Sequence, residues 1–366
     1  MKILWIDLNS SYAHSSLALP ALHAQIKDKS PYEWEMVSAT INENVGMVVE
    51  RIVAYQPDII AATMWLFNHE QLLHITSRVK ALLPKACLIL GGPEFLGENE
   101  TFLRCNPFVD AVFRGEGEEH FPQWLSCWDN PTAWATIGGL CYLDENSVYH
   151  DNGKAKTSAF DLLVPPEESR FFNWDKPFVQ LETTRGCFNT CAFCVSGGEK
   201  PVRALPIDTI RQRLDTIHQH GIKNVRVLDR TFNANPRHAK ELLNLFLEYH
   251  PHIRFHLEIH PALMNDALKS ELTRMPKGLL HLEAGIQSLR EPVLQQCRRM
   301  GKLADAMEGL KFLCSQSNLD THADLIAGLP LYRLEDIRED IHTLASYCTG
   351  EIQLESLKLL PGTEMR

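Results

Sequence analysis

The 366-residue sequence predicts an α/β protein: an N-terminal doubly wound, Rossmann-like parallel sheet followed by a partial, TIM-like (β/α)6 barrel. Three observations predict it. Short apolar runs alternate with helical patterns along residues 1–130, the alternation stops over residues 131–176, and it resumes over residues 177–366. The last region has six strand-like runs, whereas a closed barrel needs about eight strands, so we expect an incomplete barrel.

The N-terminal region contains five predicted βα units. The strands cover residues 2–7, 32–39, 58–64, 86–92 and 110–115. The helices cover residues 17–29, 45–55, 69–83, about 96–104, and 117–128. Sheets of this kind bind ligands beyond the carboxyl ends of their strands.

The middle region predicts a hairpin and a linker. GGLCYLDENSVYHDNGK resembles two short strands with a turn at Asp144-Glu145-Asn146. LLVPPEESRFFNWDKP predicts an extended segment, because paired prolines do not fit a regular element.

The C-terminal region contains the six barrel units. The strands cover residues 177–184, 223–229, 253–259, 279–286, 319–328 and 351–360. One helix is predicted by an apolar stripe that Gly221 ends; the stripe contains Ile207, Ile210, Leu214 and Ile217. Asn235-Pro236 predicts the start of the next helix, as a capping residue followed by a first-turn proline.

Composition excludes several classes of protein. Apolar residues make up 45% and charged residues 22% of the chain, as in a folded globular protein. No apolar run approaches the roughly 20 residues that span a bilayer, and Asp7 interrupts the run that a signal peptide would need. The net charge of −10 disfavours nucleic acid and anionic membranes as partners. We therefore expect a cytoplasmic protein.

Ten cysteines in such a chain are not expected to form a disulfide framework. Cys87 and Cys348 lie in or near apolar segments, where we expect their thiols to act as small core residues.

Three cysteines follow the first barrel strand in CxxxCxxC spacing: Cys187, Cys191 and Cys194. Loops at this end of a barrel carry chemistry. Structural zinc and ordinary [4Fe–4S] sites use four ligands, so three cysteines leave one metal position open for a substrate or cosubstrate. Spacing alone also allows a zinc site completed by a distant His or Cys.

The segment TTRGCFNTCAFC resembles the signature of the radical S-adenosylmethionine (SAM) superfamily, in which Phe193 supplies the aromatic residue. The resemblance implies a [4Fe–4S] cluster on the three cysteines and SAM on the open iron. It also implies reductive cleavage of SAM to a 5′-deoxyadenosyl radical, with a flavodoxin- or ferredoxin-type protein as the electron donor.

Further segments resemble the subgroup that carries a cobalamin-binding domain ahead of the barrel: FRGEGEEHF, LDRTFN, HLEAGIQS, HADLIAGLP and LKLLPGT. The resemblance assigns Asp229 to the SAM amino group and Ile326, with the apolar backbone after it, to adenine. Glu258, Glu283 and Gln287 are candidate ligands for the ribose or methionine moiety. Gly197-Gly198-Glu199 resembles a family motif but follows the cysteines too closely to end a strand, so we interpret it as a loop of chance sequence.

Cobalamin is also implied by this resemblance. Candidate cobalamin-binding residues lie in the loops after the N-terminal strands: Asn9, Ser10, Thr63, Gly91, Gly92, Pro93, Gly115, Glu116 and Gly117. None of these loops has the G-x-G-x-x-G dinucleotide pattern after the first strand. The Asp-x-His-x-x-Gly motif of many cobalamin domains is absent as well, which argues against His14 as a cobalt ligand.

The resemblance implies an enzyme, foremost a C-methyltransferase acting on a small molecule or peptide. Alternatives are a cobalamin-independent cyclase or rearrangement enzyme, and a methylthiotransferase. The latter needs a second cluster, for which four cysteines are available: Cys87, Cys105, Cys127 and Cys141. A non-catalytic Fe–S or zinc sensor is the alternative of another class. Related proteins often continue beyond the position of Arg366 into a further domain, and the sequence leaves open whether this one does.

Overall fold

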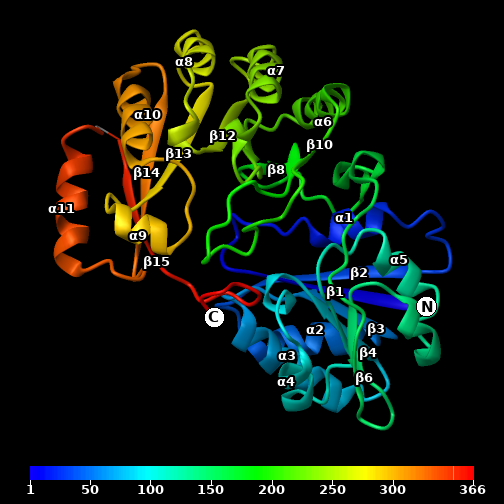
Figure 1. Cartoon of the computed structure of the whole chain (residues 1–366). Coiled ribbons are helices and arrows are strands. Elements are labelled where there is room, and N and C mark those ends of the chain that lie inside the picture. Colours follow the sequence, from blue (N-terminus) through cyan, green and yellow to red (C-terminus); the bar gives the residue numbers. More distant parts are fainter. Residues whose placement is uncertain (349) are drawn as a thin grey trace. The chain divides into compact units, whose positions relative to one another are not determined.

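The computed structural model describes residues 1–348 and 350–366. The chain divides into two compact units (Figure 1). The first contains residues 1–176, with 360–362 and 366; the second contains residues 177–359 and 363–365.

The first unit is built on a seven-stranded sheet of order β2-β1-β3-β4-β5-β6-β7. Its strands are β1 (Lys2–Asn9), β2 (Glu33–Thr40), β3 (Ile59–Thr63), β4 (Cys87–Gly91), β5 (Ala111–Phe113), β6 (Leu140–Leu143) and β7 (Tyr149–Asp151). The five predicted strands β1 to β5 are parallel, as predicted. The predicted hairpin also forms, and it extends the sheet because β6 pairs antiparallel with β5.

Helices and two apolar clusters cover both faces of this sheet. The helices are α1 (Ala18–Ala24), α2 (Val45–Tyr55), α3 (His69–Leu82), α4 (Glu100–Cys105) and α5 (His120–Leu125). Successive side chains of a strand point to opposite faces. Leu4 and Ile6 therefore pack in one cluster, with α2 and α3, whereas Ile3 and Trp5 pack in the other, with α1 and α5.

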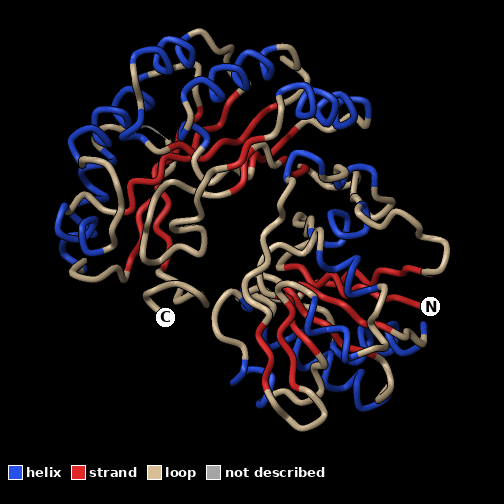
Figure 2. The backbone as a smooth tube through the Cα atoms, turned by 45° about the vertical axis from the view of Figure 1, so that its right-hand side comes forward, coloured by secondary structure: helices blue, strands red, loops and turns tan. Residues whose placement is uncertain are grey.

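The second unit contains six parallel strands in the order β15-β14-β13-β12-β11-β8, as predicted for a partial barrel. They are β8 (Val179–Leu181), β11 (Asn224–Val227), β12 (Arg254–Ile259), β13 (Leu280–Gln287), β14 (Asp320–Ala327) and β15 (Ile352–Ser356). Figure 2 shows them as one curved sheet with helices along its outer side. Two short strands that were not predicted, β9 (Thr184–Arg185) and β10 (Arg203–Ala204), pair with each other after β8.

The barrel helices are α6 (Ile207–Gln219), α7 (Pro236–Leu247), α8 (Asp266–Thr273), α9 (Glu291–Gln296), α10 (Leu303–Ser315) and α11 (Leu334–Ala345). The predicted boundaries of α6 and α7 are confirmed. Gly221 follows α6 with a φ of +73°, and the Asn235 side chain accepts a 3.1 Å hydrogen bond from the Arg237 backbone N–H at the start of α7.

Burial alternates along the barrel strands with a period of two residues. In β12, Phe255, Leu257 and Ile259 are buried, whereas His256 and Glu258 are partly exposed. β13 repeats the pattern, and its Glu283 pairs in register with Glu258. The apolar set packs under the outer helices, so the polar set lies on the inner face of the curved sheet.

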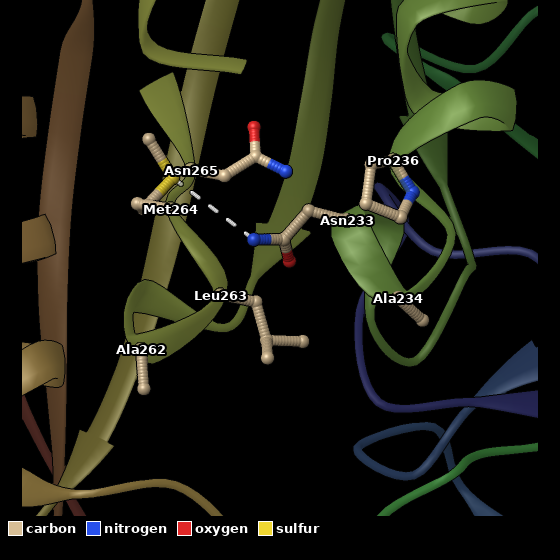
Figure 3. A pocket seen from close by; sticks show the side chains of 7 residues that line it. All are labelled: Asn233, Ala234, Pro236, Ala262, Leu263, Met264 and Asn265. Carbon is tan, nitrogen blue, oxygen red and sulfur yellow. Dashed lines mark hydrogen bonds between the residues drawn. The ribbon is translucent and has the colours of Figure 1, made fainter. Parts of the chain in front are cut away.

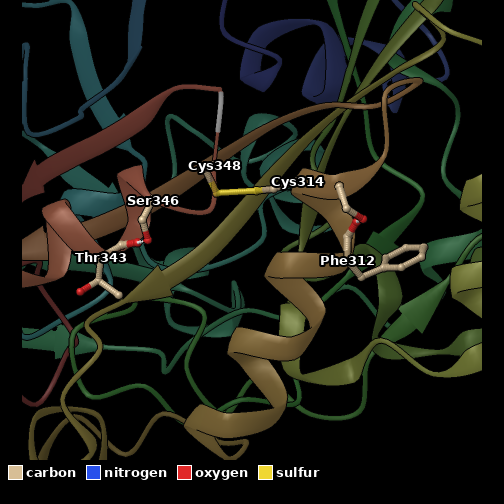
Figure 4. Close-up of a disulfide and its surroundings, with 6 residues drawn as sticks. Phe312, Cys314, Thr343, Ser346 and Cys348 are labelled. Carbon is tan, nitrogen blue, oxygen red and sulfur yellow. Dashed lines mark hydrogen bonds between the residues drawn. A yellow bond between two sulfur atoms is a disulfide. The ribbon is translucent and has the colours of Figure 1, made fainter.

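A disulfide joins Cys314, near the end of α10, to Cys348, just after α11 (Figure 4). Cys348 is buried, as predicted, but the prediction that its thiol is a free core residue was wrong. Two helix ends that are distant in sequence bring the two Cα atoms to 5.2 Å, which is within disulfide range.

Among the described helices, none combines the length and the apolar character needed to cross a bilayer.

The predicted linker packs on α1 through a buried histidine. His23 Nδ1 lies 2.9 Å from the Ser169 hydroxyl, and the ring makes edge contacts with Trp34 and Phe171. Burial, with Lys29 and Arg170 nearby, lowers the pKa of His23 to about 4, so the ring is neutral in the folded protein.

The buried His23 makes the stability of the first unit depend on pH. Its folded pKa lies below the unfolded value of about 6.5, so the unfolded chain takes up the proton first and stability falls as pH drops from about 6.5 towards 4. Between pH 7 and pH 5 this histidine accounts for at most about 2 kcal/mol of lost unfolding free energy. We expect denaturant titrations of the full chain to show a smaller loss over this interval in His23→Gln than in wild type; equal losses would contradict this assignment.

Candidate active site

The three signature cysteines lie in a compact loop that follows β8. All three thiols are free; Cys187 and Cys191 are buried and Cys194 is partly exposed. Backbone hydrogen bonds close the loop on itself: the Cys187 N–H donates to the Glu199 carbonyl at 3.0 Å, and the Gly198 N–H donates to the Asn189 carbonyl at 2.7 Å. The thiols are thus presented from a pre-folded turn.

Glycine is required inside this loop. A Cβ atom on Gly197 would lie 2.6 Å from the Cys191 carbonyl oxygen and 3.0 Å from that of Cys194. The Gly-Gly-Glu sequence lies within the loop, as predicted, and its backbone closes the loop around the cysteines.

The cysteine loop docks onto the segment after α9. The buried Asn189 side chain accepts a 3.0 Å hydrogen bond from the Met300 N–H, and the Ala192 N–H donates to the Cys297 carbonyl at 2.9 Å. Arg299 reaches back: Nη1 lies 3.8 Å from Cys191 Sγ, while Nη2 donates to the Gly285 carbonyl at 2.5 Å. Neither Asn189 nor Arg299 was predicted, because Asn189 occupies a variable position of the signature and Arg299 lies outside it.

A fourth cysteine, Cys297, approaches the loop without being equivalent to the other three. It is fully buried in an apolar cluster with Val293, Leu329 and Tyr332. Burial, with Cys191 nearby, raises the pKa of Cys297 to about 11, so its thiol stays protonated. Its surroundings are those of a core residue rather than of a metal ligand.

The loop therefore fits an iron–sulfur cluster with three protein ligands. It offers three free thiols on a turn tight enough to exclude a side chain at Gly197. Burial raises the pKa of Cys191, and the positive charge of Arg299 beside its sulfur partly opposes that rise. Phe193 packs against the apolar cluster that also contacts Ile326, so both predicted residues line one surface.

All hydrogen bonds that the structure shows for the Asp229 carboxylate are made to the protein itself. It is fully buried, and its side chain accepts hydrogen bonds from the backbone N–H groups of Thr183 (2.9 Å) and Thr184 (2.8 Å) and from the Thr183 hydroxyl. A carboxylate without exposed surface offers no face to SAM. Its contact with the SAM amino group stays a prediction, and in the described conformation Asp229 instead fixes the backbone just ahead of the cysteine loop.

Glu258 and Glu283 face each other on the inner side of the barrel. Burial and the Glu283 carboxylate raise the pKa of Glu258 to about 7, whereas Arg230 opposes this shift. Glu283 Oε2 lies 2.9 Å from His256 Nε2, and hydrogen bonds outweigh burial and hold the pKa of Glu283 well below its usual range. Glu258 is thus able to carry a proton near neutral pH, and Glu283 remains ionised.

Gln287 ends β13 in a strained conformation. Its φ is +72°, at a register shift in the β13–β14 pairing, and its buried Oε1 has no hydrogen-bond partner. Non-glycine residues with positive φ and unpaired buried acceptors occur preferentially at functional sites. Gln287 therefore remains a candidate ligand for an amino or hydroxyl group.

A pocket of about 310 Å³ opens at the carboxyl ends of β11 and β12 (Figure 3). It is lined by Asn233, Ala234, Pro236, Ala262, Leu263, Met264 and Asn265. The buried Asn233 side chain links the two loops that form the pocket. It donates to the His260 carbonyl and accepts from the His260 N–H, each at 2.9 Å.

In the first unit, the predicted loop residues divide into two groups. Asn9, Thr63 and Gly91 end adjacent parallel strands, so they lie at one edge of the sheet. Ser10 follows Asn9 and its hydroxyl lies 3.2 Å from His14 Nδ1. Gly92, just before Pro93, has a φ of +110°, and a Cβ there would lie 2.6 Å from the Met64 carbonyl oxygen.

The second group is Gly115, Glu116 and Gly117, which contact other segments of the first unit. A Cβ on Gly115 would lie 2.3 Å from the Ala155 carbonyl oxygen, and Glu116 accepts a 2.7 Å hydrogen bond from the Thr157 N–H. A Cβ on Gly117 would lie 3.1 Å from the Leu22 side chain. These contacts account for the glycines here without a ligand.

Sequence analysis missed an aromatic group at the same sheet edge. Trp65 and Phe67 stack with centroids 6.3 Å apart, and about two fifths of each side chain is exposed. The buried Asn68 holds this loop, because its side chain donates to the Leu8 and Thr63 carbonyls and accepts from the Trp65 N–H. Exposed aromatics inside a predicted ligand loop were the available signal.

Comparisons with known proteins agree with this division. A model of the B12 binding domain matches residues 6–125, and a model of the radical SAM superfamily matches residues 181–344. The cobalamin-dependent radical SAM methyltransferase TokK of Streptomyces tokunonensis is 22% identical over 334 residues, covering 85% of this chain and 48% of TokK. An uncharacterized methyltransferase of Pyrococcus horikoshii is 26% identical over 204 residues, covering 53% of this chain and 44% of the relative. The chain spans about half the length of the curated relatives it matches.

Solved structures show the same fold at low identity. TsrM from Kitasatospora setae, solved with cobalamin and a [4Fe–4S] cluster, aligns with a TM-score of 0.80 at 15% identity and covers all of this chain and 73% of TsrM. The cobalamin-dependent enzyme OxsB aligns with a TM-score of 0.76 at 15% identity and covers all of this chain and 59% of OxsB. This chain therefore carries a B12-binding domain followed by a domain of the radical SAM superfamily.

Proposed function

We propose that the protein is a cobalamin-dependent radical SAM methyltransferase that transfers a methyl group to carbon. The observation that carries the proposal is the loop of three free cysteines after β8, in a chain whose N-terminal sheet matches the B12-binding domain. Similarity to TokK over 85% of the chain supports methyl transfer. The substrate is a small molecule or a peptide, and a flavodoxin- or ferredoxin-type protein supplies electrons.

Different residues of the barrel would bind the cluster, surround it and contact SAM. Cys187, Cys191 and Cys194 would hold the cluster and leave one iron for SAM. When bound, the cluster supplies the electron for SAM cleavage and cobalamin carries the methyl group. Arg299 offsets negative charge beside Cys191, and Phe193 excludes water on one side of the loop. Gln287 offers an acceptor to SAM.

The methylthiotransferase alternative is disfavoured by the first unit. Similarity to a tRNA-2-methylthio-N(6)-dimethylallyladenosine synthase of Dichelobacter nodosus reaches 25% identity. However, Cys87 and Cys141 are buried in apolar clusters on opposite faces of the sheet, so they cannot bind one cluster together. Iron analysis tests this: about four irons per chain are expected, and about eight would contradict it.

The test of the proposal needs no substrate. Anaerobically reconstituted, dithionite-reduced protein should convert SAM to 5′-deoxyadenosine and show the absorbance of bound cobalamin. Once substrate is found, methylated product and S-adenosylhomocysteine should appear together. A protein that retains its iron but makes no 5′-deoxyadenosine would be a non-catalytic Fe–S protein; 5′-deoxyadenosine without methylation would favour the cyclase alternative.

Cys191 and Cys297 give a matched pair of variants. Cys191→Ala removes a proposed iron ligand and should abolish the cluster absorbance and at least about 90% of SAM cleavage, because two thiolates cannot complete the three-ligand set. Cys297→Ala removes a buried thiol next to the loop and should keep about four irons. Loss of iron in both variants would indicate a four-cysteine site instead.

The exposed aromatic pair should contribute to cobalamin binding. Trp65→Ala combined with Phe67→Ala removes apolar surface that the corrin ring would cover, and should weaken binding at least about tenfold, equal to about 1.4 kcal/mol. Leu82→Ala is the control, since Leu82 is 61% exposed at the end of α3 and away from the strand carboxyl ends. Absorbance titration with hydroxocobalamin measures both; equal affinities would place the cofactor elsewhere.

A further inference from the structure

Two histidines and a glutamate converge inside the barrel, on three adjacent strands. His256 of β12, Glu283 of β13 and His322 of β14 each bring one nitrogen or oxygen to within 4.8 Å of the others. Glu283 Oε2 lies 2.9 Å from His256 Nε2 and 3.6 Å from His322 Nε2. On β13, Glu283 lies four residues before Gln287, which ends the strand, and His322 pairs in register with Glu283.

Two buried polar atoms in this cluster have no hydrogen-bond partner. His322 is 5% exposed and its Nε2 is unpaired; Asp324 is 8% exposed and its Oδ1 is unpaired. These two atoms lie 3.5 Å apart, too far for a good hydrogen bond. Leaving buried polar atoms unpaired costs about 1–3 kcal/mol each, so two together point to a missing ligand.

From this geometry we infer that His256, Glu283 and His322 form a binding site for a divalent transition-metal ion, with Asp324 beside them as a fourth ligand that donates through oxygen. Two imidazoles and one carboxylate are a common ligand set for zinc, and Asp324 would fill the fourth position of a tetrahedral site. An ion bonded to His322 Nε2 and Asp324 Oδ1 would satisfy both unpaired atoms. The side chains of His256 and Glu283 are 22% and 33% exposed, which leaves an entry path.

Charge balance supports the same conclusion. Glu258, Glu283 and Asp324 place three carboxyl groups near one another inside the barrel. Arg230 is the cation close to Glu258, and it acts from the rim of the barrel. A dication at this position would favour the ionised form of all three carboxyl groups, since buried carboxylates need a paired or coordinated cation.

A second layer of residues orients His322. His281 Nε2 lies 2.7 Å from His322 Nδ1, and Arg254 Nη2 lies 3.2 Å from His281 Nδ1. Metal-bound histidines usually donate from their other nitrogen to such a partner. Metal binding at His322 Nε2 therefore requires His322 Nδ1 to carry a proton and to donate it in a hydrogen bond to His281 Nε2. His281 then carries its own proton on Nδ1 and no longer accepts from Arg254, which keeps its 2.8 Å ion pair with Asp320.

The inference is tested by zinc binding to the full chain after its iron–sulfur cluster has been reconstituted. After incubation with zinc and desalting, we expect about one zinc per chain. Its X-ray absorption spectrum should show nitrogen and oxygen ligands at about 2.0–2.1 Å and no sulfur at about 2.3 Å. Zinc bound through sulfur, or no retained zinc, would overturn the proposal. Because SAM cleavage is not measured, this result is independent of the proposed function.

Variants locate the ion. His322→Ala and Glu283→Gln should each lower zinc affinity by more than about 100-fold, and His281→Gln by roughly 10- to 100-fold as an orienting residue. His342→Ala is the control, since His342 is exposed on α11, and it should bind as wild type does. Unchanged affinity in His322→Ala would overturn the assignment. If a variant does not fold, the X-ray absorption spectrum of the zinc-loaded wild-type protein still shows whether nitrogen and oxygen atoms bind the ion.

Discussion

The two-residue alternation of the barrel strands is the constraint on which the second unit depends. Phe255, Leu257 and Ile259 must point outwards to meet the helices, and this forces His256 and Glu258 inwards. A shift of one residue would exchange the two sets. Packing of the outer layer thus fixes a polar interior, and both the proposed SAM ligands and the His256–Glu283–His322 cluster lie within it.

Much of the architecture could be predicted from the sequence. The five N-terminal and six barrel strands are runs of buried residues, and such runs are visible without a structure. Asn235-Pro236 and Gly221 marked helix ends because capping and positive φ depend on local chemistry. The cysteine loop was predictable for the same reason, since its three cysteines are close in sequence.

Contacts between distant segments were not predictable in this way. No local pattern shows that β6 would extend the first sheet, or that Cys314 would meet Cys348 across 34 residues. Asp229 illustrates the same limit in the site. Its position after a strand suggested a ligand contact, but only the fold reveals that Thr183 and Thr184 occupy both of its oxygens. The approach of Cys297 and Arg299 to the cysteines is also set by tertiary packing.

Gly197 has a practical consequence. A side chain there would collide with two carbonyl oxygens of the cysteine loop, so the closest contacts that it disturbs lie within the loop itself. We therefore expect a substitution at Gly197 to disturb binding of the proposed iron–sulfur cluster more than it disturbs folding of the barrel. We expect a Gly197→Ala chain to fold and keep the red absorbance of bound cobalamin, but to lack the brown absorbance of the proposed iron–sulfur cluster.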